Sequence, residues 1–147
     1  MKTIIFVCHG NICRSCAAEF IAKDYLKKIN RLKDFNIISR AVSLEEIGND
    51  MYPPMKMELT RQGIPFSLHH STLITQKDYD NADYVFIMDD SNARRINYYI
   101  NDNRNIVFPI YKYSSGIYEI EDPWYTDRFN KVVDQLKTCI RDIFDNI

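Results

Sequence analysis

Four short, mostly apolar runs rich in β-branched and aromatic residues divide the chain into regular units. Polar or turn-forming residues stand at both ends of each run. Runs of this kind are typical of buried strands. The predicted strands cover residues 2–7, 36–42, 83–89 and 105–110.

After the loop at 8–15 and again from Phe129 onwards, apolar residues return every three or four positions, which is the pattern of a helix with one buried face. The second predicted helix opens on proline and closes on Gly63, as short helices often do. Ser91 is the expected cap of the third. The predicted helices follow the loop at 8–15, cover 53–63 and 91–100, and run from Phe129 towards the C-terminus.

Strands and helices thus alternate, which favours a mostly parallel sheet with helices on both faces. In such a sheet, ligands bind beyond the carboxyl ends of the strands. The loop of residues 8–15 follows the first predicted strand and is expected at that edge. A chain of 147 residues without a repeat or a linker predicts one domain over residues 1–147.

The charge balance argues against several classes of partner. The chain has 19 basic and 20 acidic residues and a formal charge of -1, so we expect it to bind neither nucleic acid nor a membrane. No apolar stretch approaches the roughly 20 residues of a membrane span. The N-terminus lacks a full signal peptide, and we therefore expect a cytoplasmic protein.

Four cysteines stand at positions 8, 13, 16 and 139. In a reducing compartment free thiols are more common than disulfides. A zinc site would need a second pair of ligands beside Cys13 and Cys16, and the sequence offers none with suitable spacing. We therefore expect no metal and no other cofactor.

The stretch VCHGNICRS gives Cys8 the surroundings of a nucleophile. A cysteine between a strand and a helix lies near loop N–H groups and the positive end of the helix dipole, and such surroundings favour the thiolate. Gly10 and Asn11 allow a tight turn. Ser15 can donate its hydroxyl to the thiolate, and Arg14 can hold two oxygens of a phosphate.

The same stretch resembles the signature of the low-molecular-weight protein tyrosine phosphatases. Segments MYPPM at 51–55, DYVFIMDDSN at 83–92 and EDPWYTD at 121–127 resemble later blocks of that family, in the same order. The resemblance covers essentially the whole chain. It implies a three-layer α/β fold with a four-stranded parallel sheet flanked by helices on both faces. It also implies hydrolysis of phosphotyrosine in proteins, and of small aryl phosphates, through a phosphocysteine intermediate.

The resemblance further implies which residues act in catalysis. Cys8 is the expected nucleophile, and Arg14 is expected to hold the phosphate. Asp122 is expected to be the general acid that protonates the leaving oxygen. The substrate-binding residues that it implies are His9, Gly10, Asn11, Ile12, Cys13, Ser15, Trp124 and Tyr125.

Other positions match supporting residues of the family. Cys13 matches a second loop cysteine that can form a disulfide with Cys8 and so protect it from irreversible oxidation. Ser39 and Asp89 match residues that support the loop. His69 aligns with a family histidine, although the residues that follow it differ, and we expect it to be structural.

Three alternative functions stay open. Protein arginine phosphatases of the family carry threonine at the position of Ile12, and isoleucine fits better beside a phenyl ring. Arsenate reductases on this fold relay a disulfide through cysteines in the middle of the chain, and residues 17–138 contain none. A catalytically silent phosphate-binding module would be expected to have lost Cys8, Arg14 or Asp122.

The second wall of the predicted pocket falls near Glu45, where several family members have an aromatic residue. A carboxylate there would repel acidic phosphopeptides or select basic ones. The expected partners are phosphotyrosine-containing proteins, together with phosphate or similar oxyanions. The resemblance also allows weak self-association.

Overall fold

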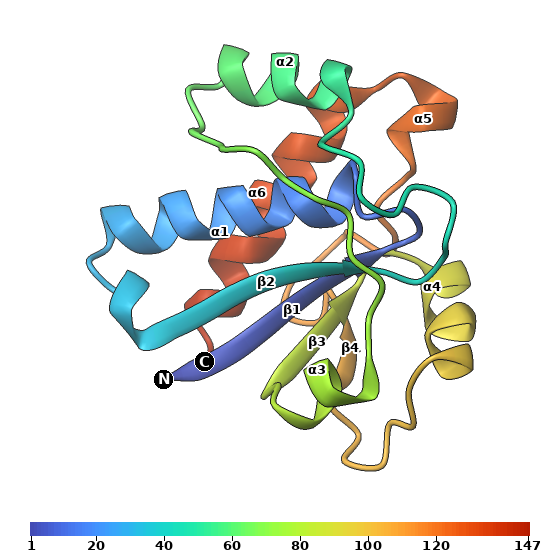
Figure 1. Ribbon diagram of the computed structural model, residues 1–147. Coiled ribbons are helices and arrows are strands. Elements are labelled where there is room, and N and C mark those ends of the chain that lie inside the picture. Colours follow the sequence, from blue (N-terminus) through green and yellow to red (C-terminus); the bar gives the residue numbers. More distant parts are fainter.

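One sheet of four parallel strands forms the centre of the computed structural model, which describes residues 1–147 (Figure 1). The strands are β1 (Lys2–Cys8), β2 (Phe35–Ala41), β3 (Tyr84–Ile87) and β4 (Val107–Pro109). Their order across the sheet is β2-β1-β3-β4. All four predicted strands are confirmed, although β3 and β4 are shorter than the apolar runs at 83–89 and 105–110.

Helices connect the strands and cover the sheet. They are α1 (Arg14–Lys28), α2 (Pro53–Arg61), α3 (Gln76–Asp80), α4 (Asp90–Arg95), α5 (Pro123–Thr126) and α6 (Phe129–Phe144). Two 3-10 turns, η1 (Leu32–Asp34) and η2 (Ile96–Tyr98), lie before β2 and after α4. No helix combines the length and the apolar character that crossing a membrane requires.

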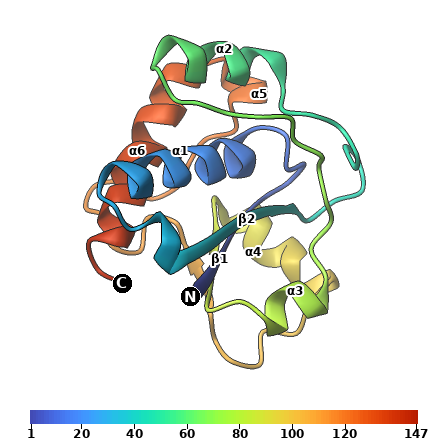
Figure 2. The same ribbon diagram turned by 60° about the vertical axis from the view of Figure 1, so that its left-hand side comes forward.

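Side chains alternate across β1 and build one core on each face of the sheet. Ile4 and Phe6 belong to the larger core, between the sheet and α1 and α6. Ile5 and Val7 belong to the smaller core, which includes Tyr79 of α3. Figure 2 shows α1 and α6 on one side of the sheet and α3 and α4 on the other. The predicted three-layer α/β fold is therefore confirmed.

The helix predicted at 91–100 is α4, which begins one residue earlier, at Asp90, and already ends at Arg95. The side chain of Asp89 caps α4, because its Oδ1 atom accepts a hydrogen bond from the Asn92 N–H at 2.9 Å. The prediction that Ser91 caps this helix is therefore wrong. After Arg95 the chain tightens into η2. The cap fixes the backbone of Asp89, whose other carboxylate oxygen is free for a contact described below.

The order of the strands opens the sheet at the end of β1. The chain passes from β1 through α1 to β2 on one side and returns to β3 on the other side. Connections that diverge in this way leave a crevice at the carboxyl ends of the strands, where open α/β sheets bind ligands. The loop of residues 8–15, the Cys8 loop, lies at this point, as the sequence predicts.

Candidate active site

The carbonyl groups of the Cys8 loop are held by residues around it. The His9 carbonyl accepts a hydrogen bond from Ser43 Oγ at 3.0 Å, and the Gly10 carbonyl accepts one from Ser71 Oγ at 2.7 Å. The Asn11 carbonyl accepts from His69 Nε2 at 2.6 Å, and the Ile12 carbonyl accepts from the Tyr52 N–H at 2.8 Å. The N–H groups of residues 9–13 donate to no other backbone group. With its carbonyls bound elsewhere, the loop has N–H groups free to surround an anion.

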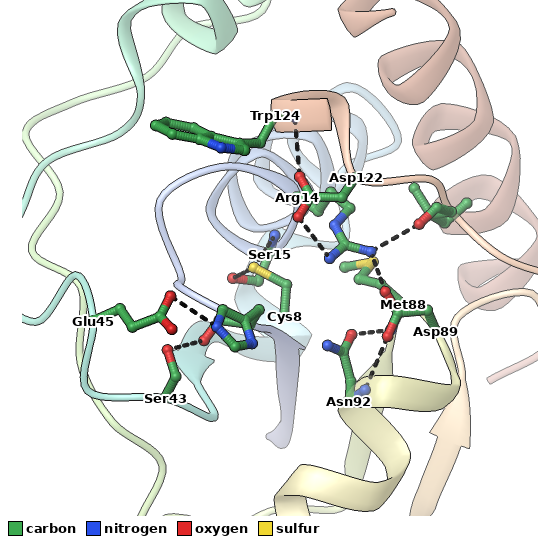
Figure 3. A network of polar contacts seen from close by, with 12 residues as sticks. Cys8, Arg14, Ser15, Ser43, Glu45, Met88, Asp89, Asn92, Asp122 and Trp124 are labelled. Atoms are coloured by element: carbon green, nitrogen blue, oxygen red, sulfur yellow. Dashed lines mark hydrogen bonds and ion pairs between the residues drawn. The ribbon is translucent and has the colours of Figure 1, made fainter. Parts of the chain in front are cut away.

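Cys8 lies within this loop at the end of β1, and its side chain is buried (Figure 3). Its Sγ atom is 3.0 Å from Ser15 Oγ, and the Ser15 N–H points at the sulfur from 3.4 Å. Asn11 Nδ2 donates a hydrogen bond to Ser15 Oγ at 2.8 Å, so the Ser15 hydroxyl proton is free for Cys8. Ser15 can therefore stabilise a negative charge on the sulfur through two hydrogen bonds.

Asn11 holds the loop from within. The residue is fully buried and adopts a positive φ of 57°, which asparagine tolerates better than most residues. Besides Ser15, its Nδ2 atom donates to Ser39 Oγ at 3.0 Å, and its Oδ1 atom accepts from the Thr72 N–H at 3.0 Å. Ser39 in turn donates to Glu19 Oε1 at 2.7 Å. The Ser39 hydroxyl proton is thus engaged by Glu19, which leaves its oxygen to accept from Asn11.

Arg14 is the first residue of α1 and is only 2% exposed. Its Nη1 atom donates to Asp89 Oδ2 at 2.7 Å and to the Ile120 carbonyl at 2.8 Å (Figure 3). Burial alone would lower the pKa of Arg14, but the charge of Cys8 and the contact with Asp89 outweigh it and raise that pKa. Arg14 therefore stays charged and fixed beside the sulfur.

Asp122 stands on the other side of Arg14. Its Oδ2 atom is 3.6 Å from Arg14 Nη2, and its Oδ1 atom accepts from the Trp124 N–H at 3.0 Å. The second contact makes Asp122 the cap of α5, which Pro123 opens. Figure 3 shows the carboxylate facing the guanidinium of Arg14. Both residues, together with Cys8, line the same pocket.

The pocket has a volume of about 180 Å³ and two unlike walls. One is aromatic: Trp124 is 57% exposed, Tyr125 is 83% exposed, and Tyr52 lies 4.9 Å from Trp124 between ring centroids. Glu45 contributes to the other wall, where its Oε2 atom is 2.9 Å from His9 Nε2. Glu45 thus lines the pocket, in the wall near which the sequence predicts it.

The same fold occurs in known proteins, and a family model agrees with it. The model for the low molecular weight phosphotyrosine protein phosphatases matches residues 3–147. This chain belongs to that family. The human low molecular weight phosphotyrosine protein phosphatase is 34% identical over 95% of this chain and 92% of its own length. For the low molecular weight protein-tyrosine-phosphatase PtpA of Staphylococcus aureus (strain bovine RF122 / ET3-1), identity is 32%, over 100% of this chain and 94% of that protein.

A solved structure supports the assignment to the low molecular weight phosphatase family. The crystal structure of YfkJ from Bacillus subtilis aligns with a TM-score of 0.92 and 28% sequence identity. The alignment covers 100% of this chain and 94% of that one. The family and the four-stranded parallel fold inferred from the motifs are therefore both confirmed.

The cysteines of this family member are all free thiols. Cys13 lines the pocket, and burial, followed by the charge of Cys8, raises the pKa of its thiol. Burial likewise raises the pKa values of Cys16 and Cys139, which lie in the core. Cys13 and Cys8 line the same pocket, and the protective disulfide between them stays a prediction.

Several residues of the site were not found from the sequence. Tyr52 and Glu46 line the pocket, and Glu19, Ser71 and Thr72 hold the loop. Tyr52 lies within the segment MYPPM, to which the resemblance gives no separate role, and the other four residues come from loops and helices outside the segments that carry the resemblance. The prediction of a structural His69 agrees with its buried position and its hydrogen bond to the Asn11 carbonyl.

Proposed function

We propose that this protein hydrolyses phosphotyrosine in proteins, and small aryl phosphates, through a phosphocysteine intermediate. The observation that carries this proposal is the pocket itself. Cys8, Arg14 and Asp122 line it together, the Asp122 carboxylate is 3.6 Å from the Arg14 guanidinium, and the N–H groups of residues 9–13 have no backbone acceptor, which supports the proposal. In this proposal a nucleophile, an anion site and an acid meet at the position that a phosphate ester occupies when it binds.

The first step forms a bond between sulfur and phosphorus. The Cys8 thiolate attacks the phosphorus atom, while Arg14 and the loop N–H groups hold the three remaining oxygens. The bond between phosphorus and the tyrosine oxygen breaks as Asp122 transfers its proton to that oxygen. The products of this step are free tyrosine hydroxyl, phosphocysteine and an Asp122 carboxylate.

The second step returns the enzyme to its starting state. The Asp122 carboxylate takes a proton from water, the water oxygen attacks phosphorus, and the bond to sulfur breaks. Inorganic phosphate leaves, and the Cys8 thiolate and the protonated Asp122 are restored. Because these residues supply the nucleophile, the charge stabilisation and the proton, we propose no cofactor.

The walls of the pocket bear on the substrate class. Trp124 and Tyr125 give a phenyl ring an apolar wall that the shorter phosphoserine would not reach, and Ile12 favours a phenyl ring over phosphoarginine. On the opposite wall, Glu45 favours a basic residue next to the phosphotyrosine. Cys139 belongs to the core and does not line the pocket, which argues against a thiol relay from α6 to Cys8. A cytoplasmic location and weak self-association stay predictions.

The test is hydrolysis of p-nitrophenyl phosphate by the reduced protein in the presence of EDTA. Turnover should disappear in Cys8→Ser and fall by about 10²-fold or more in Asp122→Asn. Peptides that carry phosphotyrosine, phosphoarginine or phosphoserine then establish the substrate class. Phosphate binding without turnover by the wild type would contradict the proposal and indicate a silent binding module.

A further inference from the structure

The segment that carries Asp122 contains little regular secondary structure. This acid segment (residues 121–128) contains only the four-residue helix α5, and Trp124 and Tyr125 within it are exposed. It ends in a sharp reversal, where Asp127 adopts a left-handed φ of 59°. One helical turn cannot hold a catalytic carboxylate by itself. Contacts elsewhere in the segment must do so.

Pro123 is buried and Trp124 packs near Tyr52, and Glu121 adds charged contacts to these. The Glu121 Oε2 atom accepts a hydrogen bond from Arg128 Nε at 2.9 Å, and its Oε1 atom forms an ion pair with Lys131 Nζ at 3.0 Å. Thr126 is the third residue that stabilises this carboxylate, and it contributes most to lowering the pKa of Glu121. These three residues therefore come from the middle of the acid segment, from its last residue and from α6. Because α6 is packed in the larger core, Glu121 joins both ends of the acid segment to a fixed element.

The Glu121 carboxylate is held more firmly than most carboxylates near a protein surface. An isolated exposed ion pair contributes little to stability, but here three residues converge on a side chain that is only 18% exposed. The hydrogen bond from Thr126, followed by those from Lys131 and Arg128, outweighs burial and lowers the pKa of Glu121 to about 2. The carboxylate is therefore ionised at neutral pH and stays so well into the acid range.

Glu121 and Asp122 are neighbours with different surroundings. Asp122 lines the pocket beside Arg14, whereas Glu121 does not line it and meets the donors of the segment and of α6. We propose that Glu121 is a positioning residue, which holds the acid segment closed so that the Asp122 carboxylate meets the leaving oxygen. This inference rests on the proposed function of Asp122 as the general acid.

The test uses leaving groups that differ in their need for an acid. Phenyl phosphate releases a phenol with a pKa of about 10, as tyrosine does, and needs a proton more than p-nitrophenyl phosphate does. In Glu121→Gln, kcat/KM should fall by about 10-fold for phenyl phosphate and much less for p-nitrophenyl phosphate. In Asp122→Asn the loss of kcat/KM should likewise be greater for phenyl phosphate than for p-nitrophenyl phosphate, and the difference between the two esters should be larger than in Glu121→Gln.

Two further variants separate positioning from a general effect of charge. Glu119→Gln makes the same change of charge at an exposed site two residues earlier and should leave both rates unchanged. Arg128→Gln should reproduce part of the Glu121→Gln effect, and the double variant should lose less than the product of the two. Urea unfolding of each variant shows whether it is folded at the assay temperature.

The outcomes are distinct from those that test the proposed function. If the wild type hydrolyses neither ester, the proposed function fails, and the role of Glu121 fails with it. If the wild type hydrolyses both esters and Glu121→Gln lowers both equally, or lowers neither, the proposed function stands and the positioning role is overturned.

Discussion

The Cys8 loop and the acid segment face each other across the pocket but are held by opposite means. Neutral, buried hydrogen bonds fix the Cys8 loop, with Asn11 and Ser15 fully buried at its centre. The acid segment lies at the surface, and a charged carboxylate, Glu121, attaches it to α6. Arg14 links the two regions, because it contacts the Ile120 carbonyl just before the acid segment.

The difference follows from what each region does in the proposed reaction. The phosphate carries negative charge in every state, so the most effective site for it is a set of dipoles that are fixed before the substrate arrives. Buried hydrogen bonds provide that rigidity. The acid must meet both a departing side chain and an incoming water, so it belongs at the open side of the pocket. Ion pairs can hold a segment there without burying it.

Replacing Arg14 by lysine should have the largest effect, since it removes the link between the two regions. Lysine cannot form the planar fork of Arg14, which contacts Asp89 and Ile120 and faces Asp122. We expect kcat/KM for p-nitrophenyl phosphate to fall by about 10³-fold and inhibition by inorganic phosphate to weaken. Arg141→Lys, at an exposed site on α6, is the control. A loss below tenfold would show that charge alone suffices at this position.

Asn11→Ala breaks the Cys8 loop without touching the acid segment. The change removes two hydrogen bonds donated by Nδ2 and one accepted by Oδ1, all in a buried site. We expect a loss of about 3 kcal/mol in the free energy of unfolding, and a lower kcat/KM, because Ser15 is no longer oriented.

Asn30→Ala is the matched control for this prediction. Asn30 has a φ of 58°, close to the 57° of Asn11, but it is exposed. Its replacement should cost only the backbone preference of asparagine, about 1 kcal/mol, and leave activity unchanged. Equal losses of stability in the two variants, measured by urea unfolding, would contradict the importance of the hydrogen bonds of Asn11.

The same contrast explains how much could be predicted from the sequence. The Cys8 loop is contiguous, so its nucleophile, turn residues and arginine stand together in VCHGNICRS. The short apolar runs predict the strands because each strand packs side chains against both cores. The helix α3 was missed because only Tyr79 of its five residues is buried, which leaves no period to detect. The sequence signal that could have predicted α3 is the capping box formed by Thr75 and Asp78 at its N-terminus.

Contacts between distant charged or polar residues could not be predicted. The resemblance predicts that Asp89 supports the Cys8 loop, but the sequence does not show that Asp89 also caps α4. Ser91 is the residue that the local pattern favours as the cap. The pairing of His9 with Glu45 joins residues 36 positions apart, and surface carboxylates have many available partners. The pattern of apolar residues determines how elements pack but says little about which charges meet at the surface.

Glu45→Gln should change substrate preference and leave the chemistry intact. Glu45 is the exposed lip of the wall opposite the acid segment, with a side chain 69% exposed. The wild type should favour a phosphotyrosine peptide with an adjacent arginine over one with an adjacent glutamate, by about threefold in kcat/KM. In Glu45→Gln this ratio should shrink, and in Glu119→Gln it should persist. The preference should also weaken with added salt. Equal ratios in all three proteins would assign the selectivity to other residues.

The smallest effect concerns the stability of the acid segment at low pH. The contacts with Thr126, Lys131 and Arg128 lower the pKa of Glu121 from 4.5 to about 2. Because the folded state binds this proton less readily than the unfolded state, Glu121 contributes stability above about pH 4.5 and loses that contribution as the pH falls towards 2. The urea midpoint of the wild type should therefore drop more between these pH values than that of Glu121→Gln. Partial exposure keeps the difference small. Equal drops of the urea midpoint in both proteins would mean that the Glu121 carboxylate is no more stabilised in the folded protein than in the unfolded chain. The acid segment would then not be held by charge, and this part of the contrast with the Cys8 loop would be wrong.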